Sequence, residues 1–300
     1  MIIINLRGGL GNQMFQYAAG REIEIQTGNK VVYSKYYITR EPNYQNHINS
    51  LQNLSVSEKQ EVNLFYGKLL AYYNKLKYWI CFNASAKKKK NTNYKEMLDS
   101  RMLISSEVHS APPLYAVKDF TFIDCYFQNA SLFVNFDRYA NELRVSSEYI
   151  PNMANKLMLK KILCSNSVCV HIRRGDYTSS KWAKDLLVCD EQYYRKGFEY
   201  ILNKETSPVF FVFSNTHEDL EWIQNHYDLP GQKVYVDLEN KDFEELYLMY
   251  QCKHFILSNS SFSWWAQKLA INKKTIVAPK KWNNREEDFS GIYEKNWTLL

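Results

Sequence analysis

The sequence lacks the long apolar segment and the N-terminal leader that would direct a chain into or across a membrane. No stretch of about 18 or more apolar residues occurs, which is the length that a spanning helix requires. The opening stretch reaches Arg7 after only a few apolar residues, too few for the core of a signal peptide. We therefore expect a cytoplasmic protein, with peripheral contact at the inner face of the membrane as the alternative.

The signatures of metal-dependent and nucleophilic enzymes are absent as well. The six cysteines form no C-x-x-C pair and several stand in apolar, strand-like segments, so we expect reduced core cysteines and no zinc site. No G-x-S-x-G, H-E-x-x-H or P-loop lysine occurs, which leaves hydrolase and kinase interpretations without support. No D-x-D pair marks a divalent metal site, and Asp237 and Glu239 come closest to one.

What the chain does have is length and a mild positive charge. Its 300 residues suit two domains of about 150 residues each. The net charge of +6 suits polyanionic partners only weakly, whether nucleic acid, an acidic membrane surface or a phosphorylated small molecule. The lysine run Lys87–Lys90 is typical of a solvated loop, and the more specific alternative is contact with anionic lipid.

The order of the expected elements indicates an α/β fold. The first half is expected to begin with a β-α-β unit over residues 2–5, 13–26 and 30–34. A polar stretch that is helical in patches follows over 35–110. A strand that leads into a helix start is expected over 120–133, and a helix that leads into the second half over 152–163. From Ser165 strands and helices alternate regularly, which predicts right-handed crossovers and a parallel sheet. The expected strands are 167–172, 208–215, 233–238, 254–259 and 274–279, with helices over 189–204, 217–227, 242–252 and 261–272.

A glycine-rich turn joins the first strand to the first helix in "LRGGLGNQMFQYA". It imitates a dinucleotide-binding fingerprint, but Met14 stands at the third glycine position and no acidic residue closes the second strand. The turn can still bring Gly11, Asn12, Gln13 and backbone amides close to a ligand at the start of a helix. The simpler alternative is a tight turn without a ligand.

Two adjacent arginines follow the strand in "VCVHIRRGDY". Arg173 and Arg174 stand at the carboxyl end of that strand, the edge at which open α/β sheets bind ligands. Two neighbouring guanidinium groups repel each other unless an anion lies beside them. The pair therefore predicts an anion site, with two surface arginines as the alternative of equal weight.

Serines separate a strand from a helix in "LSNSSFSWWAQKLA". Asn259, Ser260 and Ser261 stand where hydroxyl groups cap a helix and its amides point outward. Such a helix start can bind phosphate without a lysine. Trp264 and Trp265 are expected to anchor the helix by packing.

Together, "GGLGNQMFQYA", "HIRRGDY" and "CKHFILSNSSFSWWA" resemble the bacterial α-1,2-fucosyltransferases of glycosyltransferase family 11. The three motifs occur in the family's order and span residues 8–266. The resemblance implies a GT-B fold of the α/β class, in which two Rossmann-like domains face a central cleft. We expect an acceptor-side domain over 1–155 and a domain for GDP-L-fucose over 156–300, with packing of the last residues back on the first domain as an open alternative.

The resemblance also implies how the donor is held. Arg173, joined by Arg174, would bind the diphosphate through bidentate charge-assisted hydrogen bonds, and His171 would lie near the guanosine. The remaining phosphate oxygens and the donor would be bound by Ser260 and Ser261 with their helix amides, and by Asn259 and Ser214.

Guanine recognition and proton transfer complete the expected site. Guanine needs an acceptor for its N1 and N2 hydrogens, and the family's acidic position falls on Glu245, where aspartate is more usual; Asp242 is the substitute. Asp176 is the nearest carboxylate for a general base, but capping the turn is an equal alternative, and a phosphate oxygen of the leaving group can also take the proton. Asn12 would contact the fucose or the phosphate from the opposite domain.

The expected activity is inverting transfer of L-fucose from GDP-L-fucose to the 2-hydroxyl of a galactose-terminated oligosaccharide or glycolipid. No cofactor, no metal and no nucleic acid is expected. Two alternatives stay open: a GT-B transferase that uses another GDP-sugar, and a non-catalytic module that binds a nucleotide or a glycan.

Metal independence gives a direct test. Since arginines and a helix start would supply the positive charge, we expect excess EDTA to change the initial rate of sugar transfer by less than about twofold. A rate that is lost with EDTA and restored by Mn²⁺ would contradict this and would make Asp237 and Glu239 the candidate ligands.

Overall fold

The computed structural model describes residues 1–300 apart from six segments and the side chains of Phe82 and Asp176. The six segments are 41–46, 57–60, 83–93, 106–107, 179–182 and 286–287. The prediction for Lys87–Lys90 therefore lies outside the described residues.

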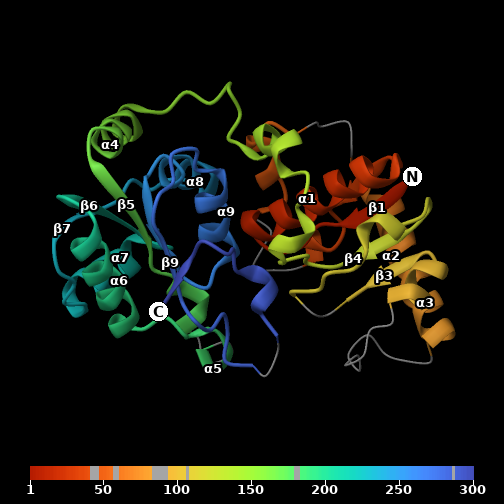
Figure 1. Cartoon of the computed structure of the whole chain (residues 1–300). Coiled ribbons are helices and arrows are strands. Elements are labelled where there is room, and N and C mark those ends of the chain that lie inside the picture. Colours follow the sequence, from red (N-terminus) through yellow and green to blue (C-terminus); the bar gives the residue numbers. More distant parts are fainter. Residues whose placement is uncertain (41–46, 57–60, 83–93, 106–107, 179–182, 286–287) are drawn as a thin grey trace. The chain divides into compact units, whose positions relative to one another are not determined.

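The chain divides into two compact units (Figure 1). The first comprises Met1–Leu143 and Ser290–Tyr293, and the second comprises Arg144–Phe289 and Glu294–Leu300. The sequence placed the boundary at 155/156, twelve residues later than the structure does. The chain joins the second unit at Arg144, because this guanidinium donates to the Leu269 carbonyl and lies 5.3 Å from the centre of the Tyr250 ring.

The first unit is built on a four-stranded parallel sheet with the order β2-β1-β4-β3. Its strands are β1 (Ile2–Asn5), β2 (Val31–Ser34), β3 (Met102–Ile104) and β4 (Phe122–Asp124), and its α-helices are α1 (Leu10–Thr27), α2 (Leu64–Phe82) and α3 (Tyr94–Asp99). The predicted β-α-β start is confirmed. The expected helix start after β4 is wrong, since short 3₁₀ turns follow that strand in the described chain.

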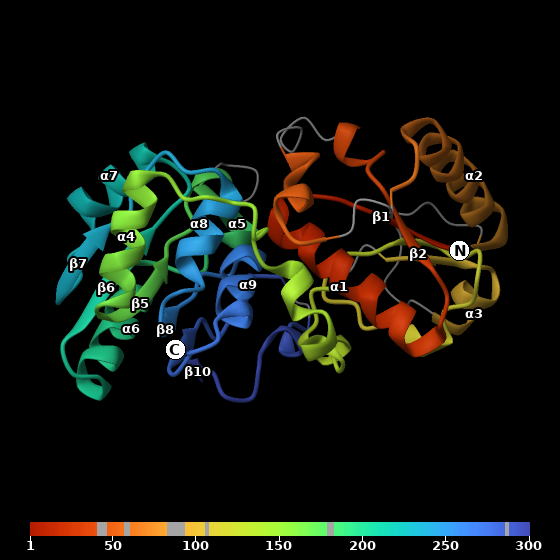
Figure 2. The same ribbon diagram turned by 90° about the horizontal axis from the view of Figure 1, so that it is seen from above.

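Helices α1 and α2 cover opposite faces of this sheet, on either side of β1 in Figure 2. Neighbouring residues of a strand point to opposite faces. The α1 glycine Gly20 lies against Val31 and Tyr33, so no larger side chain fits there. Val32, on the other face, packs in one cluster with Ala71 of α2.

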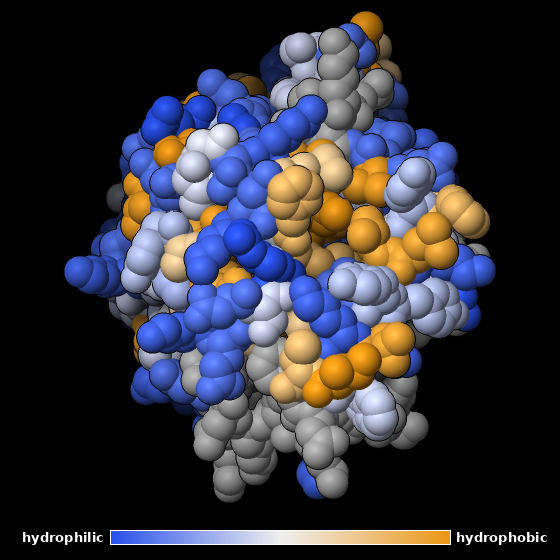
Figure 3. Space-filling model, turned by 90° about the vertical axis from the view of Figure 1, so that its right-hand side faces the viewer, coloured by the Kyte–Doolittle hydropathy of each residue, from blue (hydrophilic) through white to orange (hydrophobic). Residues whose placement is uncertain are grey.

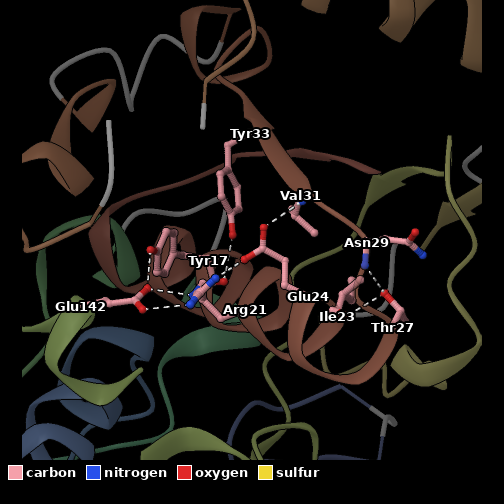
Figure 4. A network of polar contacts seen from close by, with 9 residues as sticks. All are labelled: Tyr17, Arg21, Ile23, Glu24, Thr27, Asn29, Val31, Tyr33 and Glu142. Carbon is pink, nitrogen blue, oxygen red and sulfur yellow. Dashed lines mark hydrogen bonds and ion pairs between the residues drawn. The ribbon is translucent and has the colours of Figure 1, made fainter. Parts of the chain in front are cut away.

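A polar network fixes α1 to its neighbours (Figure 4). The Tyr17 hydroxyl donates to Glu142 over 2.6 Å, and Arg21 forms ion pairs with both Glu142 and Glu24. Glu24 in turn accepts from the backbone of Val31 in β2, over 2.9 Å. Burial, together with the Glu142 carboxylate, raises the pKa of Tyr17, so the phenol stays protonated and remains a donor.

The second unit is built on a six-stranded parallel sheet with the order β7-β6-β5-β8-β9-β10. Its strands are β5 (Asn166–His171), β6 (Pro208–Phe213), β7 (Gln232–Tyr235), β8 (His254–Ile256), β9 (Ile276–Ala278) and β10 (Thr298–Leu299). Counted along the chain, this order reads 3-2-1-4-5-6, the doubly wound order of nucleotide-binding folds. The predicted class, α/β with two Rossmann-like units, is confirmed.

Helices cover both faces of this sheet. They are α4 (Met153–Leu163), α5 (Ala183–Leu186), α6 (Glu191–Lys204), α7 (His217–His226), α8 (Asp242–Met249) and α9 (Ser261–Leu269). The inward face of α6 and α7, with Phe198 and Ile223, packs against Val168 and Val170 of β5. In Figure 2, α4, α8 and α9 lie side by side. Within the described parts of the chain, no helix has the length and apolar character needed to cross a bilayer.

Candidate functional site

The sheet of the second unit reverses its strand order between β5 and β8. These strands pair directly, with Val168 opposite His254 and Val170 opposite Ile256. The connection after β5 leads toward β6 and the one after β8 leads toward β9, so the two loops diverge at the carboxyl edge. In open α/β sheets, this switch point is the crevice in which ligands bind. The segments that carry the predicted arginines and serines therefore flank one ligand position of the fold.

A hydrogen bond joins the two strand ends at this point. Nδ1 of His171, the last residue of β5, lies 2.8 Å from the Ser258 hydroxyl, and both residues are buried. Ser263 of α9 continues the network, since its hydroxyl donates to the Ser258 carbonyl over 3.2 Å. Burial, assisted by the positive charge of Arg173, lowers the pKa of His171 to about 3, so the ring is neutral at physiological pH.

Arg173 lies at the edge of the crevice. Its guanidinium carbon is 5.3 Å from the centre of the Tyr177 ring, and the Tyr177 hydroxyl donates to the Asn259 carbonyl over 3.0 Å. The side chain is only partly buried. Its positive charge also acts on Glu245, where it partly offsets the rise in pKa that burial causes. Arg173 thus lies among the loops after β5 and β8 and close to α8.

Arg174 is oriented toward α7. Its guanidinium lies 3.3 Å above the Trp222 ring and its Nε is 3.5 Å from Oδ1 of Asp219. Its backbone N–H donates to the Asn215 side chain over 3.2 Å, and Gly175 donates to Asp219 over 3.1 Å. These contacts hold the turn after β5 in place, and the two neighbouring arginines have different partners.

The start of α9 faces the same edge of the sheet. Ser260 is buried and caps the helix, because its hydroxyl accepts from the Phe262 N–H over 3.2 Å. Ser261, the first residue of α9, is partly exposed. The first-turn amides of a helix lack partners within the helix and carry its positive dipole end, which suits phosphate oxygens.

Asn259 and Ser214 are engaged within the protein. The Asn259 amide donates to the carbonyls of Leu186 and Trp282, each over 2.9 Å. The Ser214 hydroxyl donates to the Ile172 carbonyl over 2.7 Å. Both side chains connect strand ends and loops around the crevice, so their predicted contact with a donor would compete with these bonds.

Glu245 is a partly buried carboxyl group in the first turn of α8. Burial, assisted by the nearby Asp242 and opposed by the charge of Arg173, raises its pKa to about 8. The carboxyl group is therefore largely protonated at neutral pH. No local sequence pattern indicates this shift, since its cause is desolvation in the fold.

The glycine turn of the first unit forms a second polar cluster. Gly8 adopts a φ of +70°, and a side chain there would collide with Asn12. The Asn12 side chain accepts from Gln128 over 2.7 Å. Gln13 is buried and its amide donates to the carbonyls of Gly8 and His47, each over 2.9 Å. Gly11 lies in the first turn of α1.

Sequence reasoning missed the ion pair beside this turn. Arg7 binds Asp124 through two contacts of 2.9 and 3.1 Å, and its guanidinium lies 4.3 Å from the centre of the Tyr37 ring. Arg7 follows β1 and Asp124 ends β4, which are adjacent strands. The polar residues at the ends of these two strands could have predicted the ion pair. Strand-end residues were interpreted only in the second half of the chain.

Two other predictions concern acidic residues. Asp176 lies in the 3₁₀ turn Gly175–Thr178, but its side chain is outside the described part, so its role stays a prediction. Asp237 forms an ion pair with His217. Across the described residues, no group of three or more His, Cys, Asp and Glu side chains is placed to hold a metal ion.

Comparison with known proteins gives a family match over the whole chain. The sequence model described as Glycosyl transferase family 11 matches residues 1–300. An α-1,2-colitosyltransferase of Escherichia coli is 29% identical, with 96% of this chain and 94% of that protein covered. The O-antigen biosynthesis glycosyltransferase WbnK of Escherichia coli is 28% identical, with 94% and 96% covered.

More distant similarities were also found. Human galactoside α-(1,2)-fucosyltransferase 1 is 30% identical over 117 residues, which cover 37% of this chain and 31% of that protein. Among solved structures, the fucosyltransferase NodZ from Bradyrhizobium aligns with a TM-score of 0.49 and 12% identity, with 90% of this chain and 92% of that chain covered.

The state of His171 predicts an acid-sensitive fold. The ring has a pKa of about 3 when folded, whereas an unfolded histidine titrates near about 6.5. Protons therefore bind the unfolded chain first, and the stability contributed by the neutral ring is present above the unfolded value and is lost as the pH falls. Below about pH 6 we expect the free energy of unfolding to drop by up to about 1.4 kcal/mol per pH unit from this group.

The measurement is urea unfolding between about pH 5 and 7. His171→Gln should remove this part of the pH dependence. His226→Gln, at an exposed position where the ring bonds to the Trp222 carbonyl, is the control and should keep the slope of the wild type. An unchanged slope in His171→Gln would show that the ring is not buried and neutral.

Proposed function

Since this chain belongs to glycosyl transferase family 11, we propose that it transfers L-fucose from GDP-L-fucose to the 2-hydroxyl of a terminal galactoside, with inversion at the anomeric carbon. Membership of the family makes the chain a glycosyltransferase. The sugar, the linkage and the acceptor form the proposal. The names of the relatives support the α-1,2 linkage, since they include an α-1,2-colitosyltransferase and galactoside α-(1,2)-fucosyltransferases.

One observation supports the donor site most strongly. The crevice between β5 and β8 is flanked by a partly exposed cation, Arg173, and by the positive end of α9. A nucleoside diphosphate carries its charge at one end, which suits this pairing. The order of the strands identifies the same crevice as the position where doubly wound sheets bind nucleotides.

The chemistry needs positive charge at the diphosphate. As the bond between the fucose anomeric carbon and the phosphate oxygen breaks, its electron pair goes to GDP. Arg173 would stabilise this charge through two parallel hydrogen bonds, and the first-turn amides of Ser261 and its neighbours would bind the other oxygens. Because these hydrogen-bond donors are in place before the reaction, no metal ion would be needed to stabilise the negative charge that develops on GDP. Metal independence is thus part of the proposal.

Neutral His171 and paired Arg174 have supporting roles in this proposal. A neutral His171 adds no charge beside Arg173 and keeps the loop of Ser258 attached to β5. Arg174, bound to Asp219 and Trp222, would keep the turn that presents Arg173 in place. Its predicted contact with the diphosphate would require it to leave these partners.

Glu245 is proposed to recognise guanine. Its carboxylate would accept both the N1 and the N2 hydrogens, and Asp242 in the same turn is the substitute. Because the free carboxyl group has a pKa of about 8, binding at neutral pH would release a proton. Electrostatic coupling between Glu245 and Arg173 supports a site in which base and diphosphate are bound by neighbouring residues.

The acceptor is proposed to bind the first unit, where Gly11, Asn12 and Gln13 start α1. The acceptor oxygen attacks the anomeric carbon on the face opposite GDP and must lose its proton. Asp176 or a phosphate oxygen of the leaving GDP would take it. The acceptor is proposed to be a galactose-terminated oligosaccharide or glycolipid.

A second donor has specific support. One relative that matches nearly the whole chain is named a colitosyltransferase, and colitose differs from L-fucose by the loss of one hydroxyl group. The test is GDP release by the purified chain with GDP-L-fucose or GDP-colitose, in the presence of lactose and other galactosides. Release with GDP-L-fucose supports the proposal, and release with GDP-colitose alone supports the second donor. Tight GDP binding without release from any donor would support a non-catalytic binding module.

Arg173 gives the sharpest test of the diphosphate site. Arg173→Ala should lower turnover on the order of 10²-fold or more, because it removes a charge aimed at the leaving group. Arg173→Lys should recover only part of the rate, since an ammonium group cannot form two parallel bonds. Arg195→Ala, at an exposed ion pair of α6, is the control and should keep the rate. Turnover near that of the wild type in Arg173→Ala would rule out the assignment.

Glu245 predicts a pH-dependent affinity for GDP. If only the carboxylate binds guanine, GDP should bind more tightly as the pH rises toward about 8 and should level off above it, because the free group is protonated below its pKa of about 8. Glu245→Gln should weaken binding by about 10- to 100-fold and remove this pH dependence, because its amide would meet a guanine donor. The loss should appear in the KM for the donor more than in kcat.

Calorimetric titration of GDP between about pH 6.5 and 8.5 measures both effects. Glu199→Gln, at an exposed position of α6, is the matched control. If Glu245→Gln binds GDP like the wild type at every pH, Glu245 does not bind guanine. Asp242 is then the candidate, and Asp242→Asn is the next variant to test.

A further inference from the structure

Helix α2 exposes an unusual number of large apolar side chains. It is 19 residues long and belongs to the first unit. Figure 3 looks at the structure from the side of that unit, and apolar side chains are gathered on the surface there. One stripe of α2, called the α2 apolar face, consists of Phe65, Leu69, Tyr72, Leu76 and Trp79. These side chains are exposed by 66, 50, 53, 57 and 59%, respectively.

The α2 apolar face is the side of the helix that points away from the sheet. Gly67 allows α2 to approach Ser34 of β2, and Ala71 packs in the core cluster with Ile3. Each helical residue advances by about 100°, so a residue two positions from Gly67 or Ala71, such as Leu69, lies about 200° away. Packing on the sheet therefore does not explain why these side chains are apolar.

The spacing of the stripe is regular. Its members follow one another at intervals of four, three, four and three residues, which brings them onto one face of the helix. A soluble surface helix normally carries polar residues on this side. Scattered apolar residues on a surface need no explanation, but a continuous stripe of this kind marks an interaction site.

The charges of α2 indicate what the face binds. The helix contains three lysines and no Asp or Glu. Lys68 and Lys75 are exposed and stand three or four positions from members of the apolar face, so they border it. Lys77 is on the packing side, where it donates to the Ser100 carbonyl over 2.7 Å. The exposed side of the helix thus combines apolar, aromatic and only positively charged groups.

We infer that α2 docks on the surface of an anionic bilayer, with the α2 apolar face at the boundary of headgroups and acyl chains and with Lys68 and Lys75 on the lipid phosphates. Tyr and Trp favour this boundary, because their rings combine an apolar body with a polar tip. An amphipathic helix with lysines beside Trp, Phe and Leu is typical of proteins that lie in the plane of the interface. A second copy of the chain would gain nothing from two facing sets of lysines, which favours lipid over self-association.

The inference is independent of the sugar transferred and can be tested without an activity assay. The full chain is mixed with vesicles of phosphatidylcholine alone or of phosphatidylcholine with phosphatidylglycerol, and bound protein is measured by sedimentation. We expect binding to the anionic vesicles that weakens in high salt. Lys68→Gln and Lys75→Gln should each lower the partition coefficient by about fivefold.

The apolar contribution needs a matched pair of variants. Leu69→Ser combined with Leu76→Ser should reduce binding by more than about tenfold. Ile150→Ser combined with Ile271→Ser is the control, since these isoleucines of the second unit are exposed by 78 and 79%. The control should bind like the wild type. All four side chains are exposed, so the fold should be retained, and circular dichroism checks this.

Trp79 provides a probe of depth. Its emission should shift to the blue on binding and should be quenched by lipids with brominated acyl chains, and Trp79→Phe should lose this quenching. Equal binding by the two double variants, or no binding to anionic vesicles, would overturn the inference. The inference would also be overturned if the wild type self-associated in the absence of vesicles and the Leu69→Ser and Leu76→Ser double variant did not. The α2 apolar face would then be an interface between copies of the chain.

Discussion

The hydrogen bond between His171 and Ser258 joins the two strand ends on which the proposed donor site depends. It spans 2.8 Å between buried groups at the point where the order of the strands reverses. Through it, the loop that carries Arg173 and the loop that leads to the start of α9 are held in register. The ring in this bond is neutral, because burial lowers its pKa. A charged histidine would repel Arg173 and would add unpaired charge to the interior.

The two adjacent arginines that follow β5 have different partners in the fold. Arg174 is oriented toward α7, where Trp222 and Asp219 bind it, while Arg173 lies beside Tyr177 and acts electrostatically on Glu245. Adjacent residues at the end of a strand point in different directions, so one can hold the turn while the other meets the ligand. This division of roles explains why a pair of like charges is tolerated.

The sequence predicted the second unit well, because alternating apolar strands and amphipathic helices are local patterns. Strands β5 and β6 and the start of α7 lie close to where the pattern placed them. Strand β10 was missed, since two residues carry no pattern and its pairing with β9 is a long-range contact. The boundary at Arg144 depends on contacts with Tyr250 and Leu269 that no local pattern encodes.

The candidate site likewise has features that follow from local sequence and features that depend on long-range contacts. The positions of Arg173 and Ser260 beside strand ends follow from local sequence, whereas His171 was expected only from the family resemblance. The raised pKa of Glu245 and the ion pair of Arg7 with Asp124 arise from burial and from strands distant in the chain. The exposure of the α2 apolar face could not be predicted from the sequence either, because an apolar stripe normally indicates packing in a core.

A crystal structure of the chain with GDP would show whether the crevice between β5 and β8 binds the diphosphate of the donor. We expect the diphosphate to lie within hydrogen-bond distance of both the Arg173 guanidinium and the first-turn amides of α9, with the guanine edge at Glu245. GDP bound at another edge of the sheet, or held in this crevice without Arg173, would contradict this expectation.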